Sequence, residues 1–537
     1  MESAVIIPAV KKSVAFTDDL VKKLAGISLV QRSINKAKEI TSDEHIYVVT
    51  DSEEICLICQ RNGITELFEK DIKLRPDSAL KDMSPLLRTI ASRYSDLIIL
   101  SPYAPLLDME EVRVSRERYK ADEGKLLIPV KRERGRDFRW DGKNMILPGE
   151  KNQDWFVQSQ AFKIVNKDLL ESDMGEADTE PLVYELSSDL IEIHSYQDWW
   201  VCEKLLNRKR IVFRVIGDEE VGMGHVHRAL TLAHEVTDHE VRFVCEQKSW
   251  GVVNQLAGYD YWLGVYGPEE IEDKIIKLKP DLVINDILDT QREYVQTLQR
   301  NDIRVVSFED FGDGVGYADL VINELYDEPT IHGGNIIWGR DYFFVREEFN
   351  DALPNDFNVE VEKILITFGG ADPNDLTRKV LRKIISFCKK NNIKIQIITG
   401  PAYKYINELE KEVQQLEGLD IDYTHATGIM SHIMEQTQVA ITSNGRTVYE
   451  LAHMNIPSIV MSHHEREITH RFTNEKNGFI HLGVFKGTET EKNILPALKL
   501  LVQDKQYRRK LYDRLKPFEF SHNKEKIIRM ILDVMEK

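Results

Sequence analysis

Residues 210–233 read RIVFRVIGDEEVGMGHVHRALTLA and contain the pattern that decides the fold. A β-branched run leads into Gly222-Met-Gly224, and an apolar run with helical periodicity follows directly. Glycines let the backbone turn tightly and approach a ligand, and the first turn of the next helix offers N–H groups to an anion. The stretch therefore predicts a strand, an anion-binding turn and a helix, which is the repeating unit of α/β proteins.

The same alternation of short β-branched runs with longer amphipathic runs extends through most of the chain, and it predicts parallel sheets flanked by helices. The expected strands are 4–8, 45–50, 96–100, 210–215, 240–245, 281–285, 304–307, 363–367, 394–399, 439–442 and 458–461. A basic stretch at 207–210 and a Pro-, Asn- and Asp-rich break at 348–360 interrupt the alternation. We therefore expect three α/β domains, 1–207, 208–350 and 351–537, with an amphipathic final helix that packs on a neighbouring domain.

Composition excludes several classes of protein. The 537 residues carry 71 Lys and Arg against 89 Asp and Glu, a net charge of −18 that predicts no nucleic-acid partner. No apolar run approaches the ~20 residues that span a bilayer, and the N-terminus has no signal-peptide pattern. Five scattered cysteines do not form a disulfide framework. We expect a cytoplasmic protein without a membrane span, and its oligomeric state stays open.

His225 and Arg228 follow the glycine turn and are the first candidates for a functional site. At a helix start the dipole disfavours imidazolium, which lowers the pKa of His225 toward that of a usable base. Arg228, one turn later, is predicted to contact an anionic ligand beside Gly222 and Gly224. The alternative is a structural turn that carries a surface histidine.

Two further turns follow strands in the last third of the chain. ITFGGADPNDLT (366–377) contains a glycine pair, and AITSNGRTVYE (440–450) contains a hydroxyl-rich turn that opens a helix. Such a helix start suits a diphosphate, with a nearby carboxylate accepting hydrogen bonds from ribose. The predicted ligand contacts are Gly369, Gly370, Ser443, Asn444, Gly445, Arg446, Thr447 and Glu450. One such turn could be an ordinary loop, but three in tandem α/β domains favour a cleft between two Rossmann-like domains.

Four motifs in order carry a family resemblance. They are GMGHVHRALTLA (222–233), GRDYFFVREEF (339–349), ITFGGADPNDLT (366–377) and SNGRTVYELAHMNIPSIV (443–460). Residues 210–485 resemble the UDP-sugar hydrolases of pseudaminic acid biosynthesis and spore-coat polysaccharide glycosyltransferases, relatives of the GT-B enzymes that add N-acetylglucosamine to lipid II.

The resemblance implies a GT-B-like pair of Rossmann-like domains, with His225 in catalysis, a diphosphate turn at 443–447 and Glu450 at the ribose. It implies attack of water on a UDP-linked deoxy-diacetamido sugar, which releases UDP, and no cofactor or metal for this half. The uridine base rests on the resemblance alone.

The chain departs from this family after the predicted strand that ends at Met461. The family usually shows an Asn-Gln pair here, whereas residues 463–470 read HHEREITH. These positions lie at the sugar end of the cleft, so the sugar, and hydrolysis as opposed to transfer, stay open. The histidines lack a matched carboxylate cluster, which favours a solvated loop over a metal site.

Residues 1–205 resemble the acylneuraminate cytidylyltransferases, which activate nonulosonic acids with CTP. The matching stretches are VIIPA (5–9), LAGISLVQRSI (24–34), VVTDSEEI (48–55), LRPDSALKDMS (74–84) and LIILSPYAPLLDMEEV (97–112). The resemblance implies a Rossmann-like nucleotidyltransferase domain.

The active-site residues of that family are missing from this first domain. Where the family has an Arg, two Lys and an Asn on the triphosphate, a gap-free alignment places Val10, Val14, Asp19 and Leu20. The family's Asp-x-Asp pair for magnesium reads Glu192-Ile-His194, and imidazole is a poor ligand for Mg²⁺. We therefore expect a degenerate domain kept for architecture, partner binding or regulation, with Mg²⁺ needed only if it is active.

Two remaining features have simpler interpretations. Cys56-x-x-Cys59 has the spacing of a redox or zinc site, but its apolar helical surroundings favour buried core cysteines. The basic run 130–140 is interpreted as a solvated hairpin.

The leading hypothesis is a nucleotide-sugar hydrolase of surface-polysaccharide synthesis, fused to a cytidylyltransferase-like domain. The alternatives are a GT-B glycosyltransferase, a bifunctional enzyme with active CMP-sugar synthesis, and a non-catalytic nucleotide-sugar-binding scaffold. The scaffold becomes preferable if the turn 222–228 does not face the turn 443–450.

Overall fold

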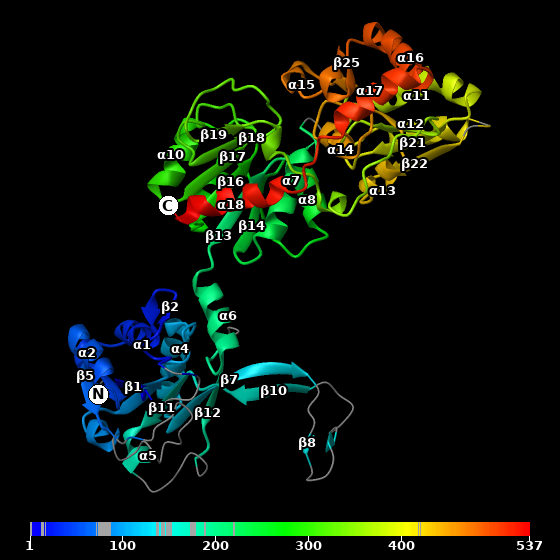
Figure 1. Ribbon diagram of the computed structural model, residues 1–537. Coiled ribbons are helices and arrows are strands. Elements are labelled where there is room, and N and C mark those ends of the chain that lie inside the picture. The colour runs from blue at the N-terminus through cyan, green and yellow to red at the C-terminus, as the bar shows by residue number, and fades with distance from the viewer. Residues whose placement is uncertain are drawn as a thin grey trace. The chain divides into compact units, whose positions relative to one another are not determined.

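The computed structural model describes residues 3–11, 16, 18–70, 72, 87–135, 139–140, 145–146, 153–171, 179–186, 190–218, 221–416, 418 and 420–536. The motif 74–84, the position of Val14 and residues 136–138 of the basic run lie outside the described residues. The chain divides into two compact units, Met1–Arg208 and Lys209–Lys537 (Figure 1).

The first unit is built on one mixed sheet. Its strands run in the order β10 (Gln153–Gln158), β7 (Leu126–Gly135), β11 (Phe162–Asn166), β6 (Asp96–Leu100), β1 (Ala4–Pro8), β4 (Ile46–Thr50) and β5 (Thr65–Phe68), with β12 (Leu182–Glu185) beside β7. The strands β6, β1, β4 and β5 are parallel, while β11 is antiparallel to β6. The predicted strands 4–8 and 96–100 are confirmed residue for residue.

Helices cover both faces of this sheet. They are α1 (Leu29–Lys38), α2 (Glu53–Asn62), α4 (Met109–Ala121), α5 (Lys167–Glu171) and α6 (Tyr196–Leu206). Buried residues of α1, α2, α4 and α6 share one core, and α5 lies in the core of the other face. Cys59 is fully buried in the first of these cores, as expected, whereas Cys56 is only partly buried and lies outside that core.

The second unit contains two parallel sheets. The first is ordered β15 (Trp262–Tyr266), β14 (Glu240–Glu246), β13 (Arg210–Val215), β16 (Leu282–Asp286), β17 (Arg304–Phe308), β18 (Leu320–Asn323) and β19 (Ile336–Trp338). The second is ordered β22 (Ile421–His425), β21 (Lys394–Thr399), β20 (Lys363–Thr367), β23 (Val439–Ser443), β24 (Ser458–Ser462) and β25 (Phe479–Val484). Both begin in a central strand, add two strands on one side and then switch to the other side, which is the Rossmann order.

Helices lie on both faces of these two sheets. We call the part of this unit that carries the first sheet its first half, and the part that carries the second sheet its other half. The helices of the first half are α7 (Gly224–Glu235), α8 (Trp250–Leu256), α9 (Ile271–Lys277) and α10 (Arg292–Arg300). The later ones are α11 (Leu376–Lys390), α12 (Ile406–Gln414), α13 (Met430–Glu435), α14 (Thr447–His453), α15 (Glu465–Ile468), α16 (Thr488–Gln503), α17 (Lys505–Leu515) and α18 (Asn523–Glu536). The α/β class and the tandem Rossmann-like arrangement of a GT-B-like pair therefore agree with the sequence prediction. Among the described residues, no helix is both long enough and apolar enough to cross a membrane.

The final helix, α18, leaves the second sheet and packs on the first half. Its Ile527, Ile531 and Val534 lie in the same core as Val226 of α7, and Lys524 forms an ion pair with Glu235. The prediction that the last helix packs on a neighbouring domain is confirmed.

Candidate functional site

The glycine turns of the two halves meet in the wall of a cavity of about 330 Å³. They follow β13 and β20, the central strands at which the two sheets switch direction, and Rossmann-type sheets bind ligands at this position. A Cβ on Gly370 would lie 2.9 Å from the Met223 nitrogen, and one on Gly224 would lie 3.2 Å from Arg446 Cδ. The two halves therefore approach so closely at these positions that a side chain larger than that of glycine would clash.

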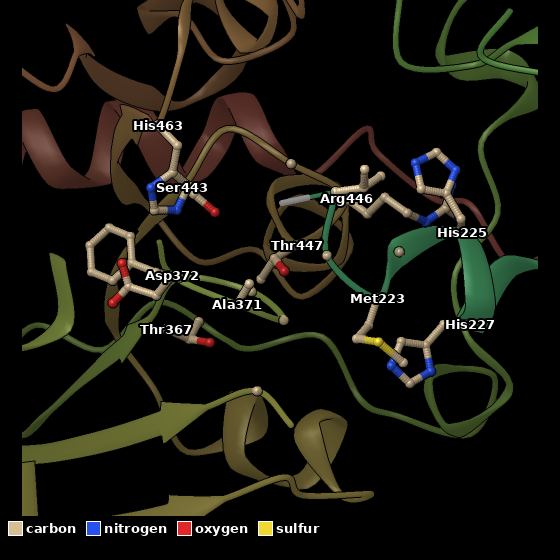
Figure 2. A pocket seen from close by; sticks show the side chains of 18 of the residues that line it. Met223, His225, His227, Thr367, Ala371, Asp372, Ser443, Arg446, Thr447 and His463 are labelled. Atoms are coloured by element: carbon tan, nitrogen blue, oxygen red, sulfur yellow. The ribbon is translucent and has the colours of Figure 1, made fainter. Parts of the chain in front are cut away.

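Most of the predicted contacts line this one cavity. They are Gly222, Gly224, His225, Arg228, Gly369, Gly370, Ser443, Gly445, Arg446, Thr447 and Glu450. In Figure 2, Arg446 extends toward the helix start that carries His225. The turns 222–228 and 443–450 face each other, so the condition that favours a scaffold is not met.

Asn444 is an exception and corrects the prediction. Its side chain is fully buried and does not line the cavity. The amide nitrogen donates to the carbonyls of Glu467 (2.6 Å) and His470 (3.1 Å), and its oxygen accepts from Thr473 (2.7 Å). Asn444 therefore holds the loop 463–470 against the turn instead of contacting a ligand.

His225 is paired with Asp286, the last residue of β16. The distance from His225 Nδ1 to Asp286 Oδ1 is 2.5 Å, and both side chains are buried. A carboxylate at Nδ1 selects the neutral tautomer with its hydrogen on that nitrogen, so Nε2 keeps a lone pair. The prediction considered only the helix dipole at His225 and missed this orienting carboxylate.

Arg228 lines the cavity, and its side chain is held by carboxylates of the same half. Its guanidinium is fully buried and donates to three carboxylates that follow or end neighbouring strands of the first sheet. Nε and Nη2 bind Asp286 at 2.8 and 2.5 Å, and Nη1 binds Glu309 at 2.5 Å and Glu324 at 2.9 Å. Arg228 therefore positions the three carboxylates around it, and its contact with a ligand stays a prediction.

Arg446, from the other half, completes this cluster by binding Glu324. Three carboxylates then face two guanidiniums, and one negative charge is left over when His225 is neutral. Burial disfavours ionisation, but the charge of Arg228, and that of His225 whenever it is protonated, outweighs it. These charges lower the pKa of Asp286 below its usual range and that of Glu309 to about 2. All three carboxylates end or follow apolar strand runs, a signal that the sequence contained.

Glu450 lines the cavity but is already paired. Its two oxygens accept from Arg346 Nε (2.8 Å) and Nη2 (3.2 Å). Each carboxylate oxygen retains a second lone pair, so a ribose hydroxyl can still bind there. The amides of Gly445, Arg446 and Thr447 donate to no acceptor in the described part of the chain.

The loop 463–470 contains no candidate metal centre. No group of three or more His, Cys, Asp or Glu that could hold an ion exists among the described residues. His470 Nδ1 lies 2.9 Å from the Asn444 carbonyl, which anchors that ring. Burial raises the pKa of Glu467 to about 7 and lowers that of His463 to about 4. Both residues line the cavity.

The magnesium pair implied for the first unit does not fit the residues present. Glu192 is buried and accepts from Ser159 Oγ (2.7 Å) and the Gln160 amide (3.0 Å), and the Lys131 ammonium lies 2.9 Å away. His194, the second member of the pair, is 70% exposed. An internal ammonium thus stands beside the carboxylate that a divalent cation would need. Asp19 is fully buried, so it does not face a phosphate.

Comparison with known proteins identifies relatives of part of the chain. No family model matches the chain. The uncharacterized protein MJ1062 of Methanocaldococcus jannaschii is 28% identical over 46% of this chain and 54% of its own length, so the match spans about half of that relative. The spore coat polysaccharide biosynthesis protein SpsG of Bacillus subtilis is 26% identical over 47% of this chain and 76% of its own length.

The name of a third relative contains both a cytidylyltransferase and a UDP-sugar hydrolase activity. It is the pseudaminic acid cytidylyltransferase and UDP-2,4-diacetamido-2,4,6-trideoxy-beta-L-altropyranose hydrolase of Helicobacter pylori, 26% identical over 27% of this chain and 23% of its own length. These proteins are homologues of the chain. The resemblance to spore-coat and pseudaminic acid proteins is therefore confirmed. Among solved structures, MurG of Acinetobacter baumannii aligns over 60% of this chain and 99% of its own, with 13% identity and a TM-score of 0.44.

Proposed function

We propose that the second unit hydrolyses a nucleotide sugar, namely a UDP-linked deoxy-diacetamido sugar of surface-polysaccharide synthesis. The observation that carries this proposal is the His225–Asp286 pair, which opens onto a cavity whose opposite wall is the turn 443–447. The names of the homologues from Bacillus subtilis and Helicobacter pylori support the substrate class.

The turn at the start of α14 is suited to the diphosphate. The amides of Gly445, Arg446 and Thr447 offer donors at the cavity wall, whereas the Arg446 side chain is paired with Glu324. Donors fixed in advance stabilise the charge that develops on a departing diphosphate, and they do so without a metal. Glu450 then accepts a hydrogen bond from the ribose.

The chemistry follows from the orientation of His225. Water attacks the anomeric carbon, the bond from that carbon to the diphosphate oxygen breaks, and its electron pair leaves with UDP. His225 Nε2 takes the proton from the attacking water, and the Asp286 carboxylate stabilises the imidazolium that forms. Transfer to a sugar hydroxyl uses the same pair and is the alternative reaction.

For the first unit we propose a degenerate cytidylyltransferase domain without Mg²⁺ chemistry. The support is the closed arrangement of Glu192 with Lys131, Ser159 and the Gln160 amide. If Mg²⁺ bound there, it would neutralise triphosphate charge, but Lys131 already neutralises the buried carboxylate.

The proposal is tested by incubating the full chain with a panel of UDP- and GDP-linked sugars in ¹⁸O-labelled water. Hydrolysis by attack at the anomeric carbon places the label in the released sugar and leaves the nucleotide unlabelled. Label in the nucleotide would place the attack at phosphorus, and no release from any sugar would contradict the proposal. Formation of a CMP-sugar from CTP, Mg²⁺ and a nonulosonic acid would contradict the degenerate state of the first unit.

A further inference from the structure

Glu309 has a backbone conformation that its residue type disfavours. It follows β17 with a φ of 51°, in the left-handed region where a Cβ clashes with the chain. Its N–H donates to the Ile322 carbonyl (3.1 Å), and its own carbonyl accepts from Arg466 of the other half (3.3 Å). Such strain persists where the surroundings enforce it, and it is concentrated at functional sites.

The side chain of Glu309 is held by Arg228. Oε1 accepts from Arg228 Nη1 at 2.5 Å, and Nη2 of the same guanidinium lies 3.2 Å from His225 Nδ1. One planar guanidinium therefore lies next to both Glu309 and His225, and both residues line the cavity. Oε2 of Glu309 accepts no hydrogen bond from any residue that the structure describes.

The charge state of Glu309 limits what it can do. Burial opposes ionisation, but the Arg228 guanidinium outweighs it and lowers the pKa of Glu309, which favours the ionised carboxylate. A base this weak is poorly matched to proton transfer, but an ionised carboxylate is a strong hydrogen-bond acceptor. Glu309 is thus suited to hold a donor beside His225 and not to take its proton.

We infer that Glu309 is a further catalytic residue, which accepts one O–H of the attacking water while His225 Nε2 accepts the other. This inference rests on the proposed function and deepens it. Only the proton at His225 is transferred; the O–H at Glu309 stays on the product as the new anomeric hydroxyl. Water has two O–H groups and a sugar hydroxyl has one, so two neighbouring acceptors favour hydrolysis over glycosyl transfer.

The experiment compares water with methanol as the nucleophile, using a nucleotide sugar that the wild type hydrolyses. Glu309→Leu fills the space without an acceptor, and Glu309→Gly adopts the left-handed backbone without strain. For both variants we expect kcat for hydrolysis to fall about 100-fold with KM within about threefold, because ground-state binding is unchanged. We expect the ratio of methyl glycoside to free sugar to rise about tenfold, since methanol needs one acceptor only.

Two controls separate this role from a structural one. Glu328→Gln changes an exposed carboxylate that pairs with Arg471 outside the cavity, and it should leave kcat and the product ratio at wild-type values. Added formate should restore hydrolysis to Glu309→Gly but not to His225→Ala. UDP affinity near that of the wild type verifies the folded cleft in each variant.

The outcomes are distinguishable. A lower kcat with an unchanged product ratio in both Glu309 variants would show that Glu309 acts only by balancing Arg228, and it would overturn the inference. An unchanged kcat would overturn it too, while the proposed hydrolysis would stand. A wild type that releases nucleotide from no sugar in the panel would overturn the proposed function and this inference with it.

Discussion

In the first unit, one buried carboxylate, Glu192, is matched by one ammonium, Lys131. In the second unit, three carboxylates surround Arg228 and Arg446, and one negative charge remains beside His225. The first cluster is electrically closed, whereas the second faces a cavity and can compensate a positive charge that forms during a reaction. The two acidic clusters therefore differ in charge balance: side chains of the protein neutralise the first completely and leave the second with a negative charge.

The strongest test of this contrast is to remove the orienting charge in the second unit. In Asp286→Asn, the amide no longer stabilises an imidazolium and permits the wrong tautomer of His225. We expect kcat for nucleotide release to fall about 10³-fold or more, with UDP affinity within about threefold of the wild type. The matched control is Asp281→Asn at the opposite end of β16, where Asp281 pairs with Lys209 and is 40% exposed. Equal losses in the two variants would point to instability of the strand and not to catalysis.

Substitutions on the side of the cavity that binds the nucleotide should change the affinity for UDP more than kcat. Glu450→Ala removes the proposed ribose acceptor, so we expect the Kd for UDP, measured by calorimetry, to rise about tenfold or more. Glu450→Gln keeps one carbonyl oxygen and should show a smaller rise. Equal UDP affinity in the wild type and Glu450→Ala would show that the ribose assignment is wrong.

Glu467 offers a pH-dependent comparison, because its pKa is raised from 4.5 to about 7 by burial. A raised carboxyl pKa favours the folded state at pH below 4.5, and this contribution disappears as pH rises through 7. Glu467→Gln is neutral throughout, so it should gain about 3 kcal/mol of unfolding free energy relative to the wild type between pH 4.5 and 8. Denaturant titrations of both proteins at several pH values measure the difference, and parallel curves would contradict the raised pKa.

The smallest effects are expected in the first unit. Lys131→Ala leaves Glu192 with Ser159 and an amide as donors, so the free energy of unfolding of this unit should fall by about 1–3 kcal/mol. Nucleotide-sugar turnover should not change. In the wild type, CTP with Mg²⁺ should leave the melting temperature of this unit unchanged, and a clear rise would indicate a working nucleotide site.

The sequence predicted the sheets well because buried parallel strands are continuous apolar runs that end at Gly, Pro or polar residues. It also predicted the turns after β13, β20 and β23, where glycine and hydroxyl residues mark a close approach. It did not show that the side chains of Arg228 and Asn444 bind buried protein groups, because the sequence does not show whether a polar side chain faces a ligand or a buried partner. Asp286, Glu309 and Glu324 were missed because their convergence on one guanidinium depends on strand order.

The central claim is that His225 acts on a nucleotide sugar held across the cleft, and His225→Ala tests it most directly. Nucleotide release and UDP affinity should be measured on the same preparation of the wild type and the variant. The account predicts that turnover falls about 10³-fold or more while UDP affinity stays within about threefold. Turnover equal to that of the wild type would contradict it.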